Sequence, residues 1–328
     1  MALNLEQIEA VAAIVRAGFN ISAAAAALDR SQPTLSRQIQ DLERTLGVRV
    51  FARTRNKVAG LTPKGEEILR IGQRLLREAK NLAEVGRADA VEDSGELKIA
   101  TTHLHARYLL PRVMKTFAAR FPGVMLTLRQ GDPLRCCELV AEGEADIGIT
   151  TVGEKNSADI VTIPAYRVAR CVIAPRGHPL AREKNLTLKK IAAFPLVAYS
   201  APYSGRRIVD EAFARAGLKP RIVCSAIDAD VSKTYVEIGM GIAILAAIAF
   251  DPARDRGLAA IDAGHLFAPS MLNLVMRRHA YLRRHALAFI ELFAPQVGVD
   301  LIRKCIDGGD IDRAKLAREA PFATTDLC

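Results

Sequence analysis

The sequence predicts an α/β protein in which a small helical unit precedes a larger body of alternating strands and helices. Residues 1–62 begin with three runs of apolar side chains at helical spacing, each followed by a break. From residue 96 onward, short apolar runs alternate with amphipathic segments, an order typical of parallel βαβ units. The chain has 328 residues, which suits a small module joined to a larger body.

The first unit contains three predicted helices. The first spans about 5–15, and an alanine-rich second helix follows over 22–28. Ser31 is placed to cap the third helix, and Pro33 lies in its first turn, where a missing N–H costs little. Gly47 is expected to end that helix in a left-handed conformation.

The third helix has one apolar face and one polar face. Its apolar stripe consists of Leu35, Ile39, Leu42 and Leu46. The opposite face carries side chains able to hydrogen-bond base edges and phosphates: Gln32, Pro33, Ser36, Arg37 and Gln40. A short helix across a tight turn from such a helix predicts a helix-turn-helix. The alternative is a three-helix bundle with an ordinary solvated polar face.

Positive charge is concentrated in this region. Between Arg30 and Lys64, eight Lys and Arg residues accompany only Asp41 and Glu43, a local excess of six positive charges. The whole chain has a formal charge of +10, which allows either nucleic acid or an acidic membrane as a partner. The local excess favours nucleic acid, because it lies on the predicted DNA-binding unit.

Two short β-like segments, 48–51 and 58–61, flank a basic tip that contains Arg53, Arg55 and Lys57. A helical pattern then runs over about 62–88. Its apolar positions approximate a heptad, with Glu78 as the one departure: Ile68, Ile71, Leu75, Leu82 and Val85. This helix is expected to pair with a second copy of the chain, or alternatively to pack as a connector on its own domain. The polar stretch 89–95 is interpreted as a linker.

The run AAAAALDRSQPTLSRQIQDLERTLGVRVFARTRNKVAGLTPKGEEIL resembles the signature of LysR-type transcriptional regulators in order and spacing, over nearly all of residues 1–70. The resemblance implies a winged helix-turn-helix, a long linker helix that pairs subunits, and a two-lobed effector domain like a periplasmic binding protein. It also implies promoter DNA and RNA polymerase as partners and a homodimer or homotetramer. We assign DNA contacts to Ser31, Gln32, Pro33, Thr34, Ser36, Arg37, Gln40, Arg53, Arg55 and Lys57.

The expected domains follow from these elements. They are a DNA-binding domain over 1–62, a linker helix and hinge over 63–94, an effector domain over 95–306, and a weakly ordered tail over 307–328. Within the effector domain, lobe I is expected over 95–165 and 268–306, and lobe II over 166–267. Strands are expected over 97–101, 125–130, 145–150, 196–199 and 221–226, and helices over 106–120, 133–142, 205–216 and 230–239.

Hydroxyl side chains follow several predicted strands, where ligands bind in open α/β sheets. Thr101 and Thr102 close the strand over 97–101, Thr151 follows the strand over 145–150, and Ser204 opens a helix. Together they can bind a small oxyanion with neutral donors and helix N-termini. The alternative is that each is only a helix cap.

The segments IATTHLHARYLLPRVMKTFAARFPGV, PLVAYSAPYSGRRIVDEAFARAGLKPRIV and DADVSKTYVEIGMGIAI are similar to the cysteine-regulon (CysB-like) branch of the family. That similarity implies control of sulfur assimilation genes and a sulfate-sized anion pocket. The ligands of the branch correspond here to Thr102, Leu104, His105, Thr151 and Ser204. Leu104 replaces a threonine and His105 a glutamine, and Val168 replaces a large aromatic residue, which widens the cleft.

These replacements change the expected effector. Leu104 removes a hydroxyl and adds apolar surface, so a small organic, sulfur-related anion is expected to bind more tightly than sulfate. An unperturbed His105 titrates near pH 6.5, so anion affinity is expected to rise as the pH falls. His103 and His105 form an H-x-H pair, but no third ligand shares their spacing, and no metal or cofactor is expected.

The remaining features exclude other classes of protein. The N-terminus has no basic stretch before an apolar run, and no apolar run is long enough to span a membrane. The six cysteines, without framework spacing, are interpreted as buried thiols of a cytoplasmic protein. An enzyme or a solute-binding protein on the same body is the alternative function, but no GxGxxG, GxSxG or HExxH motif supports an enzyme.

Overall fold

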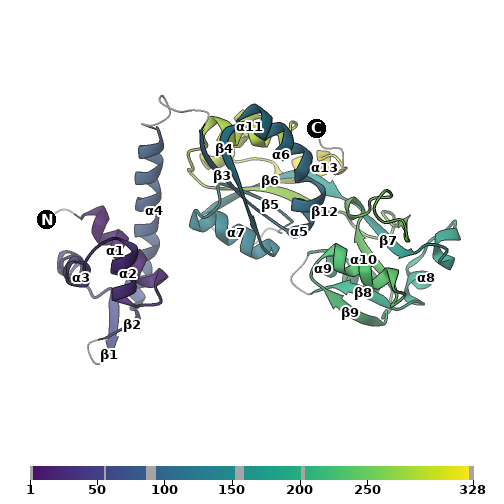
Figure 1. The fold of residues 1–328 in the computed structure, drawn as a ribbon, viewed down its shortest axis with the longest axis horizontal. Helices are drawn as coiled ribbons and strands as arrows, with labels where there is room; N and C mark the ends of the chain where they lie inside the picture. Colours follow the sequence, from purple (N-terminus) through teal and green to yellow (C-terminus); the bar gives the residue numbers. More distant parts are fainter. Residues whose placement is uncertain (1–2, 55–56, 86–93, 152–158, 201–203, 325–328) are drawn as a thin grey trace. The chain divides into compact units, whose positions relative to one another are not determined.

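The computed structural model describes residues 3–54, 57–85, 94–151, 159–200 and 204–324. The chain divides into two compact units, Met1–Ala90 and Val91–Cys328 (Figure 1). Among the described helices, none combines the length and apolar character that a bilayer crossing requires.

The first unit is the predicted winged helix-turn-helix with a long helix after it. Its elements are α1 (Leu5–Arg16), α2 (Ile21–Ala27), α3 (Gln32–Leu46), β1 (Phe51–Thr54), β2 (Lys57–Leu61) and α4 (Pro63–Val85). Ser31 caps α3, Pro33 lies in its first turn, and Gly47 ends it with φ 68°, as predicted. Leu35, Ile39 and Leu42 of the apolar stripe are buried with Ile14 and Phe51 in one core, and Leu46 packs against it half-buried.

The first wing strand begins later than expected. Strand β1 starts at Phe51, whereas the sequence suggested 48–51. The carboxylate of Glu43 in α3 accepts hydrogen bonds from the amides of Val50 (2.8 Å) and Phe51 (3.2 Å). These amides therefore bind the helix rather than a neighbouring strand, and the antiparallel β1–β2 pairing is displaced toward the wing tip.

The second unit contains two five-stranded sheets. Lobe I has the order β4-β3-β5-β12-β6 and lobe II the order β11-β7-β10-β8-β9. The strands of lobe I are β3 (Ser94–Thr101), β4 (Gly123–Gln130), β5 (Ile147–Thr150), β6 (Ile160–Val168) and β12 (Ser270–Arg277). Those of lobe II are β7 (Arg170–Pro175), β8 (Leu196–Tyr199), β9 (Ile222–Ala226), β10 (Ile242–Ala246) and β11 (Leu258–Asp262).

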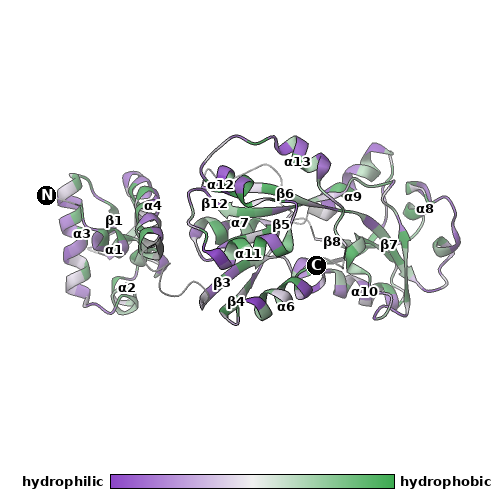
Figure 2. Ribbon diagram, turned by 90° about the horizontal axis from the view of Figure 1, so that it is seen from above, coloured by the Kyte–Doolittle hydropathy of each residue, from purple (hydrophilic) through white to green (hydrophobic). Residues whose placement is uncertain are grey.

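Helices cover both faces of each sheet (Figure 1). In lobe I, α6 (Leu110–Arg120) and α11 (Arg284–Phe293) contribute to one core, and α7 (Pro133–Glu142) to the core on the other face. In lobe II, α8 (Leu188–Ala192) and α9 (Ser204–Arg215) pack on one face and α10 (Ala229–Glu237) on the other. Figure 2 shows hydrophobic residues along the strands of both sheets, whereas α3 and α13 (Arg313–Glu319) are largely hydrophilic.

The sheets are mixed rather than wholly parallel. Strands β3, β4 and β5 are parallel, as are β8, β9 and β10, but β6, β7, β11 and β12 pair antiparallel with their neighbours. Strand β6 extends to Val168, three residues beyond the expected end of that part of lobe I at residue 165.

The helix expected over 106–120 is two helices, α5 (His103–Tyr108) and α6. Pro111 lies in the first turn of α6 and has no N–H to donate to the carbonyl of Arg107, so the ladder breaks between them.

The prediction of a weakly ordered tail over 307–328 is wrong for the residues that the structure describes. Helix α13 forms there, after α12 (Val299–Ile306). The side chain of Arg167 in β6 donates a 2.7 Å hydrogen bond to the carbonyl of Ala320, and its guanidinium lies 4.3 Å from the centroid of the Phe322 ring. The backbone of Arg167 also pairs with Pro321 and Ala323. The tail is thus attached to the edge of the lobe I sheet.

Candidate functional site

The polar face of α3 is available for DNA. Gln32, Pro33, Thr34, Arg37 and Gln40 are exposed, and Ser36 is half-buried. Ser31 and Thr34 also serve the helix itself, because the Ser31 hydroxyl accepts from the Thr34 amide (3.3 Å) and lies 2.7 Å from the Thr34 hydroxyl. Capping of α3 therefore explains the presence of Ser31 and Thr34 at these positions without any contact with DNA.

The wing supplies further positive charge. Lys57 is exposed, whereas Arg53 lies 4.0 Å from the Glu43 carboxylate, which partly balances its charge. Arg55, also predicted to contact DNA, lies outside the described residues. Of the two described wing residues, Lys57 is therefore the one whose charge no described carboxylate balances.

A pocket of about 520 Å³, including its mouth, lies between the two lobes. Helix α5 begins directly after β3, and Thr151 directly follows the neighbouring β5, so the parallel strands bring these segments together. Lobe II contributes the start of β7, the end of β8 and the start of α9. The lining residues are Thr102, His103, Leu104, His105, Thr151, Val168, Arg170, Tyr199, Gly205, Ile227, Asp228, Ala246 and Ser270.

The pocket contains five of the predicted effector residues: Thr102, Leu104, His105, Thr151 and Val168. Thr101 does not line it. Its hydroxyl is buried in lobe I and donates a 2.9 Å hydrogen bond to the carbonyl of Ile149. Ser204 begins α9 beside the lining residue Gly205, and its side chain lies outside the part of the structure that is described.

His105 is buried and neutral. Its Nδ1 lies 2.8 Å from the Thr102 hydroxyl, and its ring also hydrogen-bonds the backbone of Ile149. Burial lowers the pKa of His105 to about 4, against the opposing effect of the Ile149 hydrogen bond. The expectation that this histidine titrates near 6.5 is therefore wrong, because the ring is held within lobe I and away from solvent.

The hydrogen bond with His105 also uses the hydroxyl of Thr102. Because Nδ1 of His105 faces the hydroxyl, the ring N–H that reaches the Ile149 carbonyl is at Nε2. In that assigned tautomer Thr102 donates its single proton to Nδ1. Thr102 then has no hydroxyl proton to give to an anion.

Arg170, which was not predicted from the sequence, lies in the same pocket. It is the first residue of β7 and only 3% exposed. Its Nη2 donates to the Ser270 hydroxyl, and its guanidinium lies against Gly205, where an added Cβ would be 3.2 Å from Nη1. Burial lowers the pKa of Arg170, opposed by Tyr199 and Cys171, but an arginine remains charged at neutral pH.

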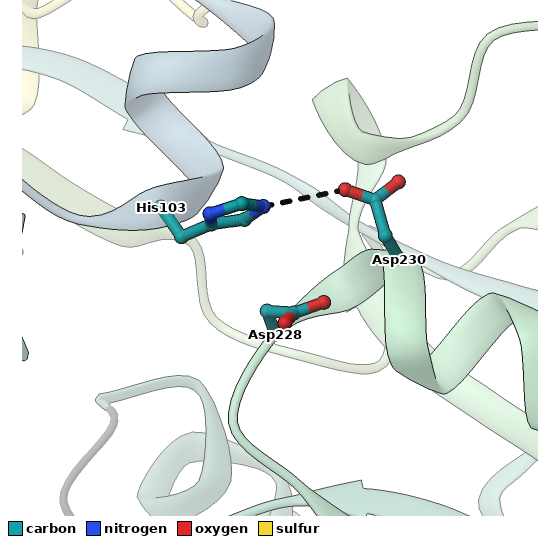
Figure 3. A group of neighbouring side chains, drawn as sticks. All are labelled: His103, Asp228 and Asp230. Carbon is teal, nitrogen blue, oxygen red and sulfur yellow. Dashed lines mark ion pairs between the residues drawn. The ribbon is translucent and has the colours of Figure 1, made fainter.

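His103, Asp228 and Asp230 form a cluster (Figure 3), and two of them, His103 and Asp228, also line the pocket. Nε2 of His103 lies 3.5 Å from Asp230. The same carboxylate also lies 2.8 Å from Nε of Arg107 and 3.4 Å from Nζ of Lys233. Two fixed cations therefore already neutralise Asp230 and would repel a metal ion. His105 is not part of this cluster.

The prediction of buried thiols is confirmed for four of the five described cysteines. Cys136, Cys137, Cys171 and Cys305 are buried free thiols, and Cys224 is half-buried and free. Burial raises the pKa of Cys136 to about 12 and that of Cys137 to about 11, so both remain protonated and unreactive at neutral pH. Cys328 lies outside the described residues.

Two family models match the chain. The model described as "Bacterial regulatory helix-turn-helix protein, lysR family" matches residues 5–66, and that described as "LysR substrate binding domain" matches residues 90–298. The chain belongs to the LysR family of bacterial transcriptional regulators. The LysR-type helix-turn-helix and effector domain expected from the sequence are thereby confirmed.

LysR-family relatives cover almost the whole chain. The transcriptional regulator SsuR of Burkholderia cenocepacia is 45% identical over 295 residues, 90% of this chain and 96% of the relative. CysB of the same organism is 41% identical over 306 residues, 93% of this chain and 98% of the relative. The crystal structure of the cofactor-binding domain of the Cbl regulator is 40% identical, with a TM-score of 0.63, and covers 66% of this chain and 95% of that one.

These relatives confirm the resemblance to the CysB-like branch. They are transcriptional regulators, so the protein is a regulator related to SsuR, CysB and Cbl and not an enzyme. The alternative of an enzyme or solute-binding protein on this α/β body is not favoured.

Proposed function

We propose that this protein binds the promoters of sulfur-metabolism genes through α3 and the wing, and that a small organic anion in the pocket between its lobes sets the transcriptional response. The likeness to SsuR and CysB over at least nine-tenths of the chain supports the choice of genes. The exposed polar face of α3 supports DNA binding. We place the protein in the cytoplasm, acting as a homodimer or homotetramer together with RNA polymerase.

The single observation that carries the effector proposal is the convergence of both lobes on one pocket. Residues that directly follow β3 and β5 line it together with the last residue of β8, and ligands of α/β proteins bind at such strand ends. Beside its polar groups, the lining includes apolar side chains from Leu104, Val168, Ile227 and Ala246. A ligand with a carbon chain fits these surfaces better than a bare inorganic ion.

Gel-shift titrations with DNA upstream of sulfur-metabolism genes, and upstream of the regulator's own gene, test the DNA half of the proposal. We expect binding to at least one such fragment to exceed binding to random DNA of equal length. The matched variants are Arg37→Ala on the exposed face of α3 and Lys219→Ala, an equal change of charge at an exposed position of the second unit. Specific binding should fall for Arg37→Ala only. Equal affinity for promoter and random DNA would reject the proposal.

A further inference from the structure

We propose that Arg170 is the residue that binds the charged group of the effector, and that the effector is a singly charged organic oxyanion, either a carboxylate or a sulfonate. This inference rests on the proposed effector role of the pocket. It adds the chemical class of the ligand and names the residue that selects for it.

The guanidinium of Arg170 is held in place but incompletely bound. Nη2 donates to the Ser270 hydroxyl, and Gly205 leaves room for the guanidinium at the start of α9. Nε is buried and makes no hydrogen bond with any residue that the structure describes. Among the same residues, no carboxylate forms an ion pair with Arg170. A buried cation in this state is costly, because burial removes its hydration without supplying a counter-charge.

Lys233 is a second buried cation, and the protein itself supplies the carboxylate that balances its charge. Lys233 is 6% exposed, and its Nζ lies 2.9 Å from both carboxylate oxygens of Asp255. It also donates to the Tyr108 hydroxyl and to the Ala249 carbonyl. Arg170 is equally buried, but among the described residues its guanidinium hydrogen-bonds only the Ser270 hydroxyl. The difference indicates that the counter-ion of Arg170 comes with the ligand.

The surroundings of Arg170 limit the charge and the shape of that ligand. Asp228 is the only carboxylate among the described lining residues and already caps α10 by accepting from the Val231 amide (2.8 Å). Its negative charge disfavours a second negative charge on the ligand. Leu104, Val168 and Ile227 offer apolar surface to a short carbon chain. A dianion such as sulfate has neither the charge nor the surface that this pocket matches.

Titration calorimetry on the full-length protein tests the inference with ethanesulfonate, propanoate, sulfate and the neutral ethyl methyl sulfone. We expect wild type to bind at least one of the two organic monoanions, and to bind it more tightly than sulfate or the sulfone. Comparison of ethanesulfonate with propanoate distinguishes a sulfonate site from a carboxylate site. Arg170→Met should weaken this binding by at least about ten-fold, as expected when a charge-assisted hydrogen bond is lost.

Two further variants make the result decisive. Arg206→Met removes a neighbouring arginine whose charge Asp210 matches at 2.7 Å, and it should bind the anions like wild type. Arg170→Lys keeps the charge but not the planar donor set, so its affinity should lie between those of wild type and Arg170→Met. Arg170→Lys also decides the matter if Arg170→Met does not fold.

Several outcomes would overturn the inference. These are a wild type that binds neither organic monoanion, a sulfone that binds as well as they do, or an Arg170 variant that keeps wild-type affinity. None of these depends on DNA, so the inference can fail while promoter binding stands. Conversely, loss of promoter recognition in the gel shifts would reject the proposed regulation without changing the calorimetry.

Discussion

The phenol of Tyr108 in lobe I donates a 2.6 Å hydrogen bond to the carboxylate of Asp230 in lobe II. Nζ of Lys233 lies 2.8 Å from the same phenol oxygen, and Nε of Arg107 lies 2.8 Å from the second carboxylate oxygen. Tyr108 and Arg107 belong to α5, the helix whose first residues line the pocket. A ligand that moves the start of α5 therefore acts on the contact between the lobes.

The first prediction concerns this contact. Asp230→Asn removes the charge that Arg107 and Lys233 share, and we expect amides of α5 and α10 to exchange hydrogen faster because the lobes separate more readily. Burial raises the pKa of Asp230, but the Tyr108 hydrogen bond and the charges of Lys233 and Arg107 together lower it. A carboxyl group whose pKa is lower in the folded than in the unfolded protein stabilises the fold at any pH above its unfolded pKa. This stabilisation is lost only as the pH falls through the folded pKa. The contact is thus intact at neutral pH.

Asp210→Asn is the matched control for the first prediction. It removes an exposed carboxylate that pairs with Arg206 within lobe II, and exposed pairs of this kind contribute little. If the amides of α5 and α10 exchange hydrogen no faster in Asp230→Asn than in Asp210→Asn, the Asp230 contact does not hold the lobes together.

The second prediction concerns pH and His105. Its pKa falls from 6.5 to about 4 on folding, so the unfolded chain binds more protons between these values and stability decreases as the pH falls through this range. Relative to His105→Gln, wild type should lose up to about 3 kcal/mol of unfolding free energy between pH 6.5 and 4. Urea unfolding across that range measures the difference. A constant difference would mean that the ring is not held neutral.

The same pKa predicts a flat binding profile. Because His105 stays neutral from about pH 6 to 8, its ionisation should add no pH dependence to anion affinity in that range. Calorimetry with wild type and His105→Gln should give parallel profiles. An affinity that rises as the pH falls in wild type, but not in His105→Gln, would restore the histidine as the charge sensor.

Local signals in the sequence predicted much of the fold, but not the strands that depend on distant partners. Helix α7 has the predicted bounds of 133–142, because Asp132, Pro133 and Gly143 mark its ends. Strands β6 and β7 are almost wholly buried, so they lack the period-two alternation that identifies a half-buried strand. Their antiparallel partners lie far along the chain.

Only part of the pocket was predictable, again because some of its residues depend on partners far along the chain. The rule that ligands bind at strand ends, with the family resemblance, led to Thr102 and Thr151. The neutral state of His105 results from its burial in the folded protein, and the importance of Arg170 depends on Ser270 and Gly205. These partners are distant in sequence, and only folding brings them together. The one local signal for Arg170 is a single charge in the apolar run VARCVIAP.

The third prediction separates base recognition from phosphate binding. Gln32→Ala on the exposed face of α3 should lower affinity for the specific site by about 1–3 kcal/mol and leave random DNA unaffected. Lys57→Ala in the wing should weaken both DNAs alike and reduce the salt dependence by about one released ion. Gel shifts over a salt series measure both quantities. Equal losses on the two DNAs for Gln32→Ala would exclude it from base recognition.

The fourth prediction concerns helix α4, which has two apolar faces. Ile68 and Leu69 pack against the core of the first unit, and Gly72 lies against Ile8, where a Cβ would come within 2.4 Å of its Cγ2. The predicted heptad positions Ile71, Leu75 and Leu82 are instead 42%, 44% and 75% exposed. One face of α4 therefore packs on its own domain. The exposed face has the apolar pattern of a surface that pairs with a second copy of the chain.

Leu75→Asp and Leu82→Asp test whether that exposed face pairs two subunits. Neither leucine belongs to the core, so thermal unfolding of the first unit should change little. If the leucines are buried on pairing, each change should weaken association by at least about 1.5–3 kcal/mol, and sedimentation should show smaller species that bind promoter DNA less tightly. Gln73→Asp adds the same charge at an exposed position on another face of the helix and should leave the assembly intact. Wild-type sedimentation for both leucine variants would place the subunit interface elsewhere.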